Sequence, residues 1–154
     1  MRVLLDTNII LDVLLEREPF VTDAQALFDA IESQTVERYV TATTLTDIFY
    51  IVRKSKGIQT GKDAVSRLLA TMKICPVNRR ILQAAILSNL SDFEDAVQLV
   101  CATSLNLDAI VTRDRVACRR HIAQTSQAVQ YQFSQPESYC KTFLNKIYNL
   151  KFTI

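Results

Sequence analysis

Four aspartates, widely spaced along the chain, carry the chemistry that the sequence suggests: Asp6, Asp47, Asp95 and Asp114. Carboxylates gathered within a few Å raise one another's pKa unless a cation neutralises them. Oxygen ligands without imidazole or thiolate favour hard cations such as Mg²⁺ or Mn²⁺. Such ions polarise phosphoryl oxygens and activate water, so a phosphodiester can be displaced without a protein nucleophile. The four residues therefore predict a divalent-metal site, provided that the fold brings them together.

Two of these aspartates follow predicted strands. Asp6 comes directly after the short apolar strand at residues 3–5, and Asp114 follows the strand at 109–111 by three residues. In a parallel sheet the carboxyl ends of the strands share one edge, and ligands bind at that edge in folds of this kind. Both carboxylates are therefore expected at the same edge.

The other two aspartates lie near the starts of predicted helices. Asp47 lies in the first turn of a helix at 43–55, which begins at the edge where the preceding strand ends. Asp95 lies in the first turn of a helix that Asp92 caps, so its carboxylate faces the positive end of the helix dipole. Four segments that are far apart in the sequence can thus bring carboxylates to one place.

Each acidic residue also has an ordinary structural interpretation. Asp6 and Asp92 are suitable helix N-caps, and capping is the favoured role for Asp92, with a secondary role beside the metal. Asp47 could be solvated on a helix surface, and Asp114 could be a turn residue. One shared site explains the four positions together better than four separate coincidences.

The elements around these residues alternate between strand and helix. Strands are predicted at 3–5, 38–41, 73–76, 109–111 and 128–133. Helices separate them, including one at 64–72 after a loop bracketed by Gly57 and Gly61, and a last helix begins at Pro136. This alternation predicts a three-layer α/β/α sandwich with a mainly parallel central sheet of about five strands. Because no linker-like segment divides the 154 residues, residues 1–154 are expected to form a single domain.

Composition excludes several other kinds of site. The chain has two glycines and one histidine, His121, too few for a glycine-rich dinucleotide loop or a histidine-rich zinc site. Its four cysteines form no Cys-x-x-Cys pair, and a net charge of +2 gives no strong basic character. No apolar stretch reaches the ~20 residues of a membrane span and no signal peptide is evident, so a cytoplasmic protein without membrane contact is expected.

Four short runs of residues share their order and spacing with a known family. They are Leu-Leu-Asp-Thr-Asn at 4–8, Thr-Leu-Thr-Asp-Ile-Phe-Tyr at 44–50, Asp-Phe-Glu-Asp-Ala-Val-Gln at 92–98 and Ile-Val-Thr-Arg-Asp at 110–114. The runs resemble the PIN-domain family, and the resemblance covers about residues 1–147. It implies a PIN-like fold and an Mg²⁺- or Mn²⁺-dependent endoribonuclease acting on single-stranded RNA. It further implies the toxin half of a VapBC-type toxin–antitoxin pair, a homodimer neutralised by a small antitoxin.

Carried over to this sequence, the resemblance assigns roles to individual residues. The metal-binding and catalytic carboxylates would be Asp6, Asp47, Asp95 and Asp114. Asn8 and Thr112 would be supporting polar groups that orient Asp6 and the water at the metal. The chain departs from the family at two points, because Asp47 stands where relatives usually have Glu, and residues 116–118 replace an Asp-Phe pair.

Basic side chains near these acids would offset the repulsion of an RNA strand. Arg113 and Arg115 belong to a cluster of arginines after the predicted fourth strand and are expected to contact RNA phosphates. The Lys and Arg residues at the end of the 43–55 helix are favoured there by the helix dipole alone. Phe49 and Tyr50 are expected to be core or dimer contacts, with base stacking as an alternative for Tyr50.

Two other functions stay open on the sequence alone. A catalytically weakened PIN-like module would bind RNA or a protein partner without cutting, in keeping with the short acid Asp47. A phosphatase with Asp6 as covalent nucleophile is disfavoured, because such enzymes need a second carboxylate two residues later, where this chain has Asn8. Metal binding, and loss of cleavage in Asp6→Asn, would separate the nuclease from the module that does not cut.

Overall fold

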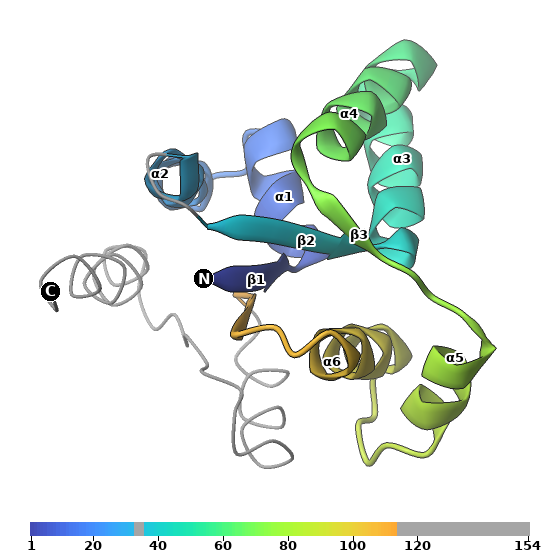
Figure 1. Ribbon diagram of the computed structural model, residues 1–154. Coiled ribbons are helices and arrows are strands. Elements are labelled where there is room, and N and C mark those ends of the chain that lie inside the picture. The colour runs from blue at the N-terminus through green and yellow to red at the C-terminus, as the bar shows by residue number, and fades with distance from the viewer. Residues whose placement is uncertain (33–35, 114–154) are drawn as a thin grey trace, which may run out of the picture.

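The central sheet has four parallel strands within residues 1–32 and 36–113, the part of the chain that the computed structural model describes. The strands are β1 (Arg2–Leu5), β2 (Glu37–Thr41), β3 (Lys73–Cys75) and β4 (Ala109–Val111), in the spatial order β3-β2-β1-β4 (Figure 1). Val3 of β1 is in register with Arg38 of β2 and Ala109 of β4. The predicted α/β fold with a mainly parallel sheet is confirmed. The strand predicted at 128–133 lies outside the described residues.

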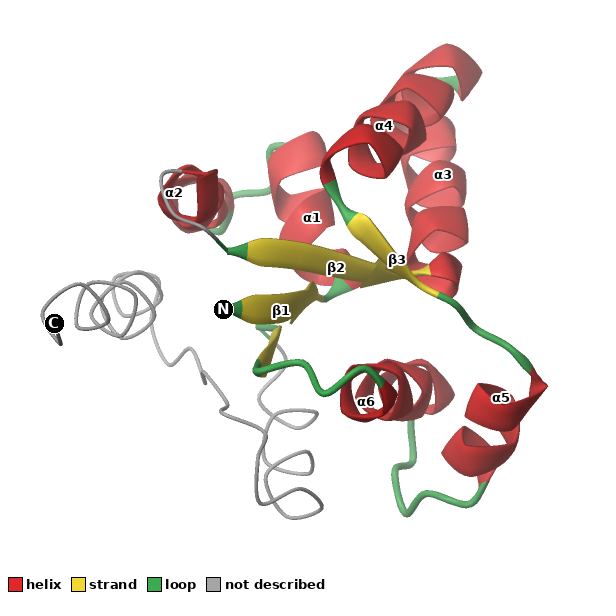
Figure 2. Cartoon of the chain, in the orientation of Figure 1, coloured by secondary structure: helices red, strands yellow, loops and turns green. Residues whose placement is uncertain are grey.

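Helices cover both faces of this sheet and complete three layers. Figure 2 shows α1 to α4 on one face and α5 and α6 on the other. Their bounds are α1 Thr7–Leu14, α2 Val21–Glu32, α3 Ala42–Lys56, α4 Ile58–Thr71, α5 Arg79–Ile86 and α6 Phe93–Ser104. The helices lie between successive parallel strands, as crossover connections require.

Residues of β1 alternate between two apolar cores, one under each helical layer, because successive strand side chains point to opposite faces. Val3 and Leu5 belong to the core beneath α1 to α4, and Leu4 belongs to the core beneath α5 and α6. All three side chains are fully buried. Because β1 is packed on both faces and paired on both edges, its carboxyl end is a rigid position for a functional group.

Side-chain caps define where three of the helices begin. Thr41 accepts a hydrogen bond from the backbone N–H of Thr44, and Asn78 accepts one from the N–H of Ile81. Asp92 caps α6, and this confirms the capping role that its position predicts. These caps satisfy N–H groups that have no partner within their own helix.

The corner between α3 and α4 differs from the loop that its glycines predict. Gly57 alone makes the turn, with a φ of +91° that favours glycine, and α4 begins at the next residue. Gly61 lies inside α4, where an added Cβ would stand only 3.2 Å from the carbonyl oxygen of Phe49 in α3. Gly61 therefore allows the close approach of two helices, which local sequence does not reveal.

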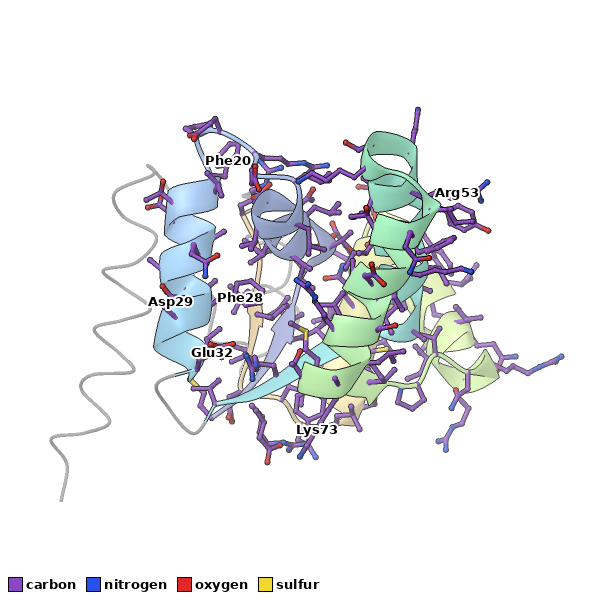
Figure 3. The ribbon with its side chains drawn as sticks, turned by 90° about the horizontal axis from the view of Figure 1, so that it is seen from above. Phe20, Phe28, Asp29, Glu32, Arg53 and Lys73 are labelled. Carbon is purple, nitrogen blue, oxygen red and sulfur yellow. The ribbon has the colours of Figure 1, made fainter. Side chains whose placement is uncertain are left out.

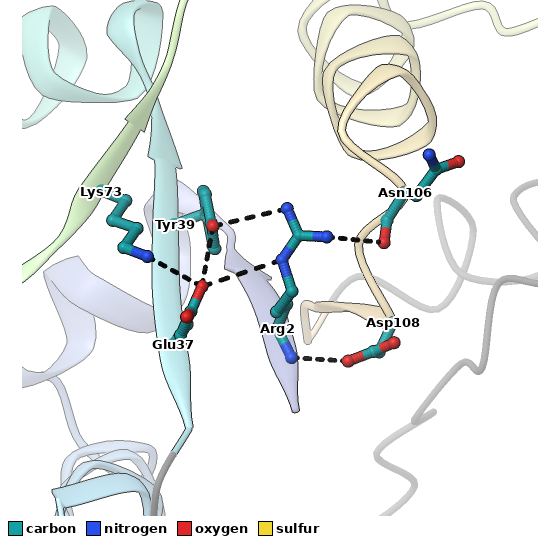
Figure 4. A network of polar contacts seen from close by, with 6 residues as sticks. All are labelled: Arg2, Glu37, Tyr39, Lys73, Asn106 and Asp108. Carbon is teal, nitrogen blue, oxygen red and sulfur yellow. Dashed lines mark hydrogen bonds and ion pairs between the residues drawn. The ribbon is translucent and has the colours of Figure 1, made fainter.

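The amino ends of the strands are joined by a polar network (Figure 4). The Arg2 backbone N–H donates to Asp108 Oδ2 at 2.6 Å, and the Arg2 guanidinium lies over the ring of Tyr39. Glu37 Oε2 lies 2.9 Å from Lys73 Nζ and accepts a hydrogen bond from the Tyr39 hydroxyl at 2.9 Å. The pKa of Glu37 lies below its ordinary value, mainly because of the hydrogen bond from Lys73 and next because of the one from Tyr39. The charges at this edge are thus paired with one another.

Two sequence predictions concern the chain as a whole. None of the described helices is long and apolar enough to cross a membrane. The single domain at 1–154 stays a prediction, because residues 114–154 lie outside the described part of the chain.

Candidate functional site

Asp6 lies at the carboxyl end of β1, in the N-cap position of α1, and is only 6% exposed. Its backbone N–H donates to the carbonyl of Val111 at 3.0 Å, which fixes it beside the end of β4. Its side chain makes no capping hydrogen bond to α1. Instead, Oδ1 accepts from Gln98 Nε2 at 3.1 Å and Oδ2 accepts from the Thr112 hydroxyl at 2.7 Å. The carboxylate is therefore oriented by two side chains from distant segments rather than used as a cap.

A second carboxylate, Glu94 in the first turn of α6, shares a donor with Asp6. Gln98 Nε2 lies 3.4 Å from Glu94 Oε1, and the Thr7 hydroxyl donates to that same oxygen at 2.6 Å. Burial raises the pKa of Glu94, and the negative charges of Asp6 and Asp47 raise it further. The hydrogen bonds from Thr7 and Gln98 lower it, but the net shift is upward. The charges of Asp6, which follows β1, and of Asp47 on α3 thus both act on Glu94 in α6, at the same edge of the sheet.

Threonine hydroxyls tie α1 to the start of α3 beneath these acids. Thr7 Oγ1 lies 3.3 Å from Thr44 Oγ1, and Thr44 Oγ1 lies 2.9 Å from Thr41 Oγ1. Thr41 Oγ1 also lies 2.8 Å from the hydroxyl of Thr43. Because Thr41 and Thr44 are fully buried, this chain of hydroxyls holds the two helix starts, and hence Asp6, in fixed relative positions.

The predicted acids that lie within the described residues are on the expected elements, but Asp47 lies past the first turn of its helix, because α3 begins at Ala42 and its first turn has no acidic residue. Asp47 is half-buried on α3, and its charge acts on Glu94. Asp95 is half-buried in the first turn of α6, and its backbone N–H donates to Asp92 Oδ1 at 3.1 Å. Asp114 lies outside the described residues. The roles of Asp47, Asp95 and Asp114 as metal ligands stay predictions.

The residues predicted to support the acids or bind RNA are placed to different extents by the structure. Thr112 is 3% exposed and makes the contact with Asp6 that its supporting role predicts. Asn8 is half-buried in the first turn of α1, beside the site in sequence. Arg115 lies outside the described residues, so its contact with RNA stays a prediction.

Arg113, which the sequence assigns to RNA phosphates, is paired within the protein, and its contact with RNA stays a prediction. Its Nε lies 3.1 Å from Asp12 Oδ2, and its guanidinium stands 4.2 Å from the ring centroid of Phe20. Asp12 is fully buried, with Arg17 NH1 as a second cation at 3.7 Å from Oδ1. The pKa of Asp12 is raised. Burial is the main cause and the charge of Asp6 adds to it, while the positive charges of Arg113 and Arg17 oppose the rise. Arg113 therefore neutralises a buried carboxylate behind the site.

Two residues of this site are absent from the sequence-based set: Glu94 and Gln98. Gln98 is 2% exposed within the apolar run of α6, and a buried polar side chain of this kind requires a partner. Glu94 precedes Gln98 by four residues and so lies on the same face of the helix. The one signal in the sequence is a glutamine within an apolar helical run with an acid four residues earlier; that this glutamine is buried is known only from the fold.

The carboxylate oxygens at this site are the type of ligand that a hard divalent cation prefers. Asp6, Asp47 and Glu94 present only oxygen, and a bound cation would relieve the repulsion that the first two exert on Glu94. Within residues 1–32 and 36–113, no three acidic, histidine or cysteine side chains are close enough to form a ready-made metal site. The described residues thus match the ligand chemistry of Mg²⁺ or Mn²⁺ but do not by themselves complete a coordination shell.

Solved structures with the same fold include three toxin–antitoxin proteins. VapC20 from Mycobacterium tuberculosis, a toxin that cleaves the sarcin–ricin loop, is 12% identical with a TM-score of 0.62, covering 73% of this chain and 89% of its own. VapBC2 from Rickettsia felis, bound to a DNA fragment from its promoter, is 16% identical with a TM-score of 0.59, covering 77% and 92%. A toxin–antitoxin complex from Klebsiella pneumoniae is 21% identical with a TM-score of 0.60, covering 85% and 99%. At these identities the likeness establishes the fold.

The sequence itself establishes the family. No curated protein matches the chain closely enough to be counted as a relative. The sequence model of the PIN domain, however, matches residues 2–116, which span β1 to β4 and every residue of the site described above. The chain therefore belongs to the PIN-domain family of nucleases.

Proposed function

We propose that the protein is a metal-dependent endoribonuclease that cuts single-stranded RNA, and that it is the toxin of a type II toxin–antitoxin pair. The orientation of Asp6 carries this proposal. A nearly buried carboxylate in a capping position that does not cap, but is held by Gln98 and Thr112, needs a role outside helix stability. Its neighbours Glu94 and Asp47 are acidic, so that role is best supplied by a shared divalent cation.

The ion would be Mg²⁺ or Mn²⁺, held by Asp6, Asp47, Asp95 and Asp114. When bound, it supplies positive charge to the phosphodiester and to the water that attacks it. Thr112 and Gln98 keep the Asp6 carboxylate in one orientation, and Thr7 does the same for Glu94. Glu94, whose pKa is raised at the site, joins the sequence-based acids as a further carboxylate facing the reaction.

A protein partner belongs to this proposal. Two of the similar structures are toxin–antitoxin assemblies, from Rickettsia felis and Klebsiella pneumoniae. By this analogy the chain would bind a small antitoxin, and we expect the chain itself to be a homodimer. An RNA substrate places the reaction in the cytoplasm, and residues 1–154 would act as one domain.

The proposal is tested by cleavage of a labelled single-stranded RNA by the purified protein with Mg²⁺, with Mn²⁺ and with a chelator. Cleavage is expected with either ion and not with the chelator, because the carboxylates repel the phosphodiester in the absence of a cation. Equal cleavage in all three conditions would contradict the metal mechanism. Binding of RNA or of the ion without any cleavage would instead identify the weakened PIN-like module, for which the short acid Asp47 is the structural reason.

Thr112→Val is expected to lower the cleavage rate by about 10- to 100-fold, because the isosteric change removes only the hydroxyl that orients Asp6 Oδ2. The measurement is initial rate at several ion concentrations, where weaker orientation should also raise the concentration needed for half-maximal activity. Thr103→Val is the matched control, since the exposed Thr103 donates its hydroxyl, among the described residues, only to the Leu99 carbonyl one turn earlier in α6. Wild-type kinetics for Thr112→Val would show that Asp6 does not depend on this contact.

A further inference from the structure

A groove runs between α3 and α4, beside the candidate site. It encloses about 500 Å³ and is lined by residues of both helices, chiefly Leu45, Phe49, Tyr50, Lys62, Val65 and Ser66. The two helices pack against each other and extend together beyond the sheet (Figures 1 and 2). Gly61 sets their separation, because its missing side chain allows α4 to approach Phe49. The groove is therefore a built feature of the helix pair.

Tyr50 supplies a flat aromatic surface at this groove. The sequence favours a core or dimer role for it, but within this chain it is not a core residue, since 63% of it is exposed. Phe49 packs edge-on against the Tyr50 ring, with centroids 5.4 Å apart and planes at 70°. A ring braced along one side and otherwise open to solvent is suited to stacking with a nucleobase.

The groove also has positive charge without a partner. The helix pair, from Ala42 to Thr71, carries five basic and two acidic side chains. Lys56 lies 3.8 Å from Glu16, but among the described residues no carboxylate pairs with Lys62 or Arg53. Figure 3 shows Arg53 at the end of α3 that points away from Lys73. Lys62, the cation in the groove lining, and the exposed ring of Tyr50 match a phosphate and a base of a single strand.

The face of α3 that bears Asp47 leads from the site to this groove. Asp47, Tyr50 and Lys54 stand three and four residues apart, so they follow one face of the helix at a rise of ~5.4 Å per turn. Thr46, next to Asp47, is itself part of the groove lining. A strand whose phosphate lies at the acids would therefore meet Tyr50 within one helical turn and further cations beyond it.

From this arrangement we infer that the α3–α4 groove binds the single-stranded RNA that flanks the cleavage point, with a base stacked on Tyr50 and a phosphate on Lys62. The assignment deepens the proposed ribonuclease function and takes its substrate class from it. A second groove, on α5 and α6, is lined by the exposed apolar residues Leu82, Ile86, Leu87 and Phe93 and also by Arg79. The α3–α4 groove is favoured for RNA because its exposed ring, Tyr50, stands on the same face of α3 as Asp47, with Lys62 across the groove on α4.

The test measures binding of a fluorescein-labelled 12-nucleotide oligouridylate by anisotropy, in chelator, so that no cleavage consumes the probe. Tyr50→Ala is expected to weaken binding about tenfold without changing its salt dependence, and Tyr50→Phe to bind as the wild type does. Lys62→Ala is expected to lower the slope of log K against log salt by about 0.7, the value for one phosphate contact on a single strand.

Lys73→Ala is the matched control for charge, because Lys73 lies at the amino edge of the sheet and pairs with Glu37. It is expected to leave both the affinity and the salt slope unchanged. Equal binding by wild type, Tyr50→Ala and Lys62→Ala, or no binding by the wild type, would overturn the inference and leave the groove to a protein partner. Groove-dependent binding without cleavage in Mg²⁺ would overturn the nuclease proposal alone, and cleavage with groove-independent binding would overturn this inference alone.

Discussion

Asp6→Asn is expected to lower the rate of metal-dependent RNA cleavage by at least about a hundredfold while the protein stays folded. Asp6 is the acid that is most firmly placed at the carboxyl edge of the sheet, nearly buried and held at both oxygens. Asparagine has almost the same shape but lacks the negative charge that a divalent ion requires of its ligand. The loss should therefore appear in activity rather than in stability.

The hydrogen bonds around Asp6 explain why the variant should fold. An asparagine carbonyl can still accept from Gln98 Nε2, and its amide can donate to the Thr112 hydroxyl, which accepts as well as donates. Both contacts that hold this side chain can therefore be kept in the variant. Removing the charge also relieves part of the repulsion that raises the pKa of Glu94. Urea unfolding should accordingly give nearly the same midpoint for the variant and the wild type.

Asp63→Asn provides the matched control for this prediction. The chemical change is the same, but Asp63 is exposed on α4 and accepts a hydrogen bond only from Gln59 Nε2 at 3.0 Å among the residues described. Its cleavage rate should equal that of the wild type. If Asp6→Asn cuts RNA at the wild-type rate, Asp6 is not a metal ligand and the acidic edge must have another function.

Much of the fold follows from local signals in the sequence. The strands β1 and β4 are short apolar runs that end at polar residues, and Asp92 caps the helix that it was expected to cap. The start of α4 was predicted wrongly. Gly61 was assigned to a loop because it is a glycine, but it lies inside α4, where it packs closely against Phe49 of α3. The reason for that glycine is a contact between helices, which no local pattern contains.

The site was predictable where position along a strand decides the geometry. Asp6 and Thr112 follow neighbouring parallel strands, so their contact is a consequence of sheet order. Glu94 was missed because its role depends on Gln98, whose burial is a tertiary property. The sequence shows the charge of Arg113 but not its ion pair, because the partner, Asp12, is on a helix about a hundred residues earlier.

Arg113→Met is expected to lower the free energy of unfolding by about 3 kcal/mol at neutral pH. The Asp12 side chain is 1% exposed and that of Arg113 24%, so the pair is largely shielded from water. In the described part of the chain the Asp12 oxygens receive ion-pair contacts but no well-directed hydrogen bond. Without Arg113 the buried carboxylate keeps only Arg17, at 3.7 Å, and its charge is poorly compensated.

The size of this deficit should depend on pH. Burial already holds the pKa of Asp12 above its ordinary value, and Arg113 is the strongest influence that lowers it, so the pKa rises further in Arg113→Met. A carboxyl group with a raised pKa in the folded state contributes full stability below its unfolded pKa and loses that contribution as pH rises through the folded pKa. Urea unfolding should therefore show a smaller deficit at about pH 5 than at about pH 7.5.

A second substitution tests whether the deficit comes from the uncompensated charge of Asp12 or from the lost packing of Arg113. Asp12→Asn combined with Arg113→Met removes the buried carboxylate, so the double variant should be more stable at neutral pH than Arg113→Met alone. Lys73→Met removes a cation from the exposed pair with Glu37 and should have a much smaller effect. A deficit that grows on acidification, or a double variant less stable than Arg113→Met, would show that packing over Phe20, rather than the charge of Asp12, is what Arg113 provides.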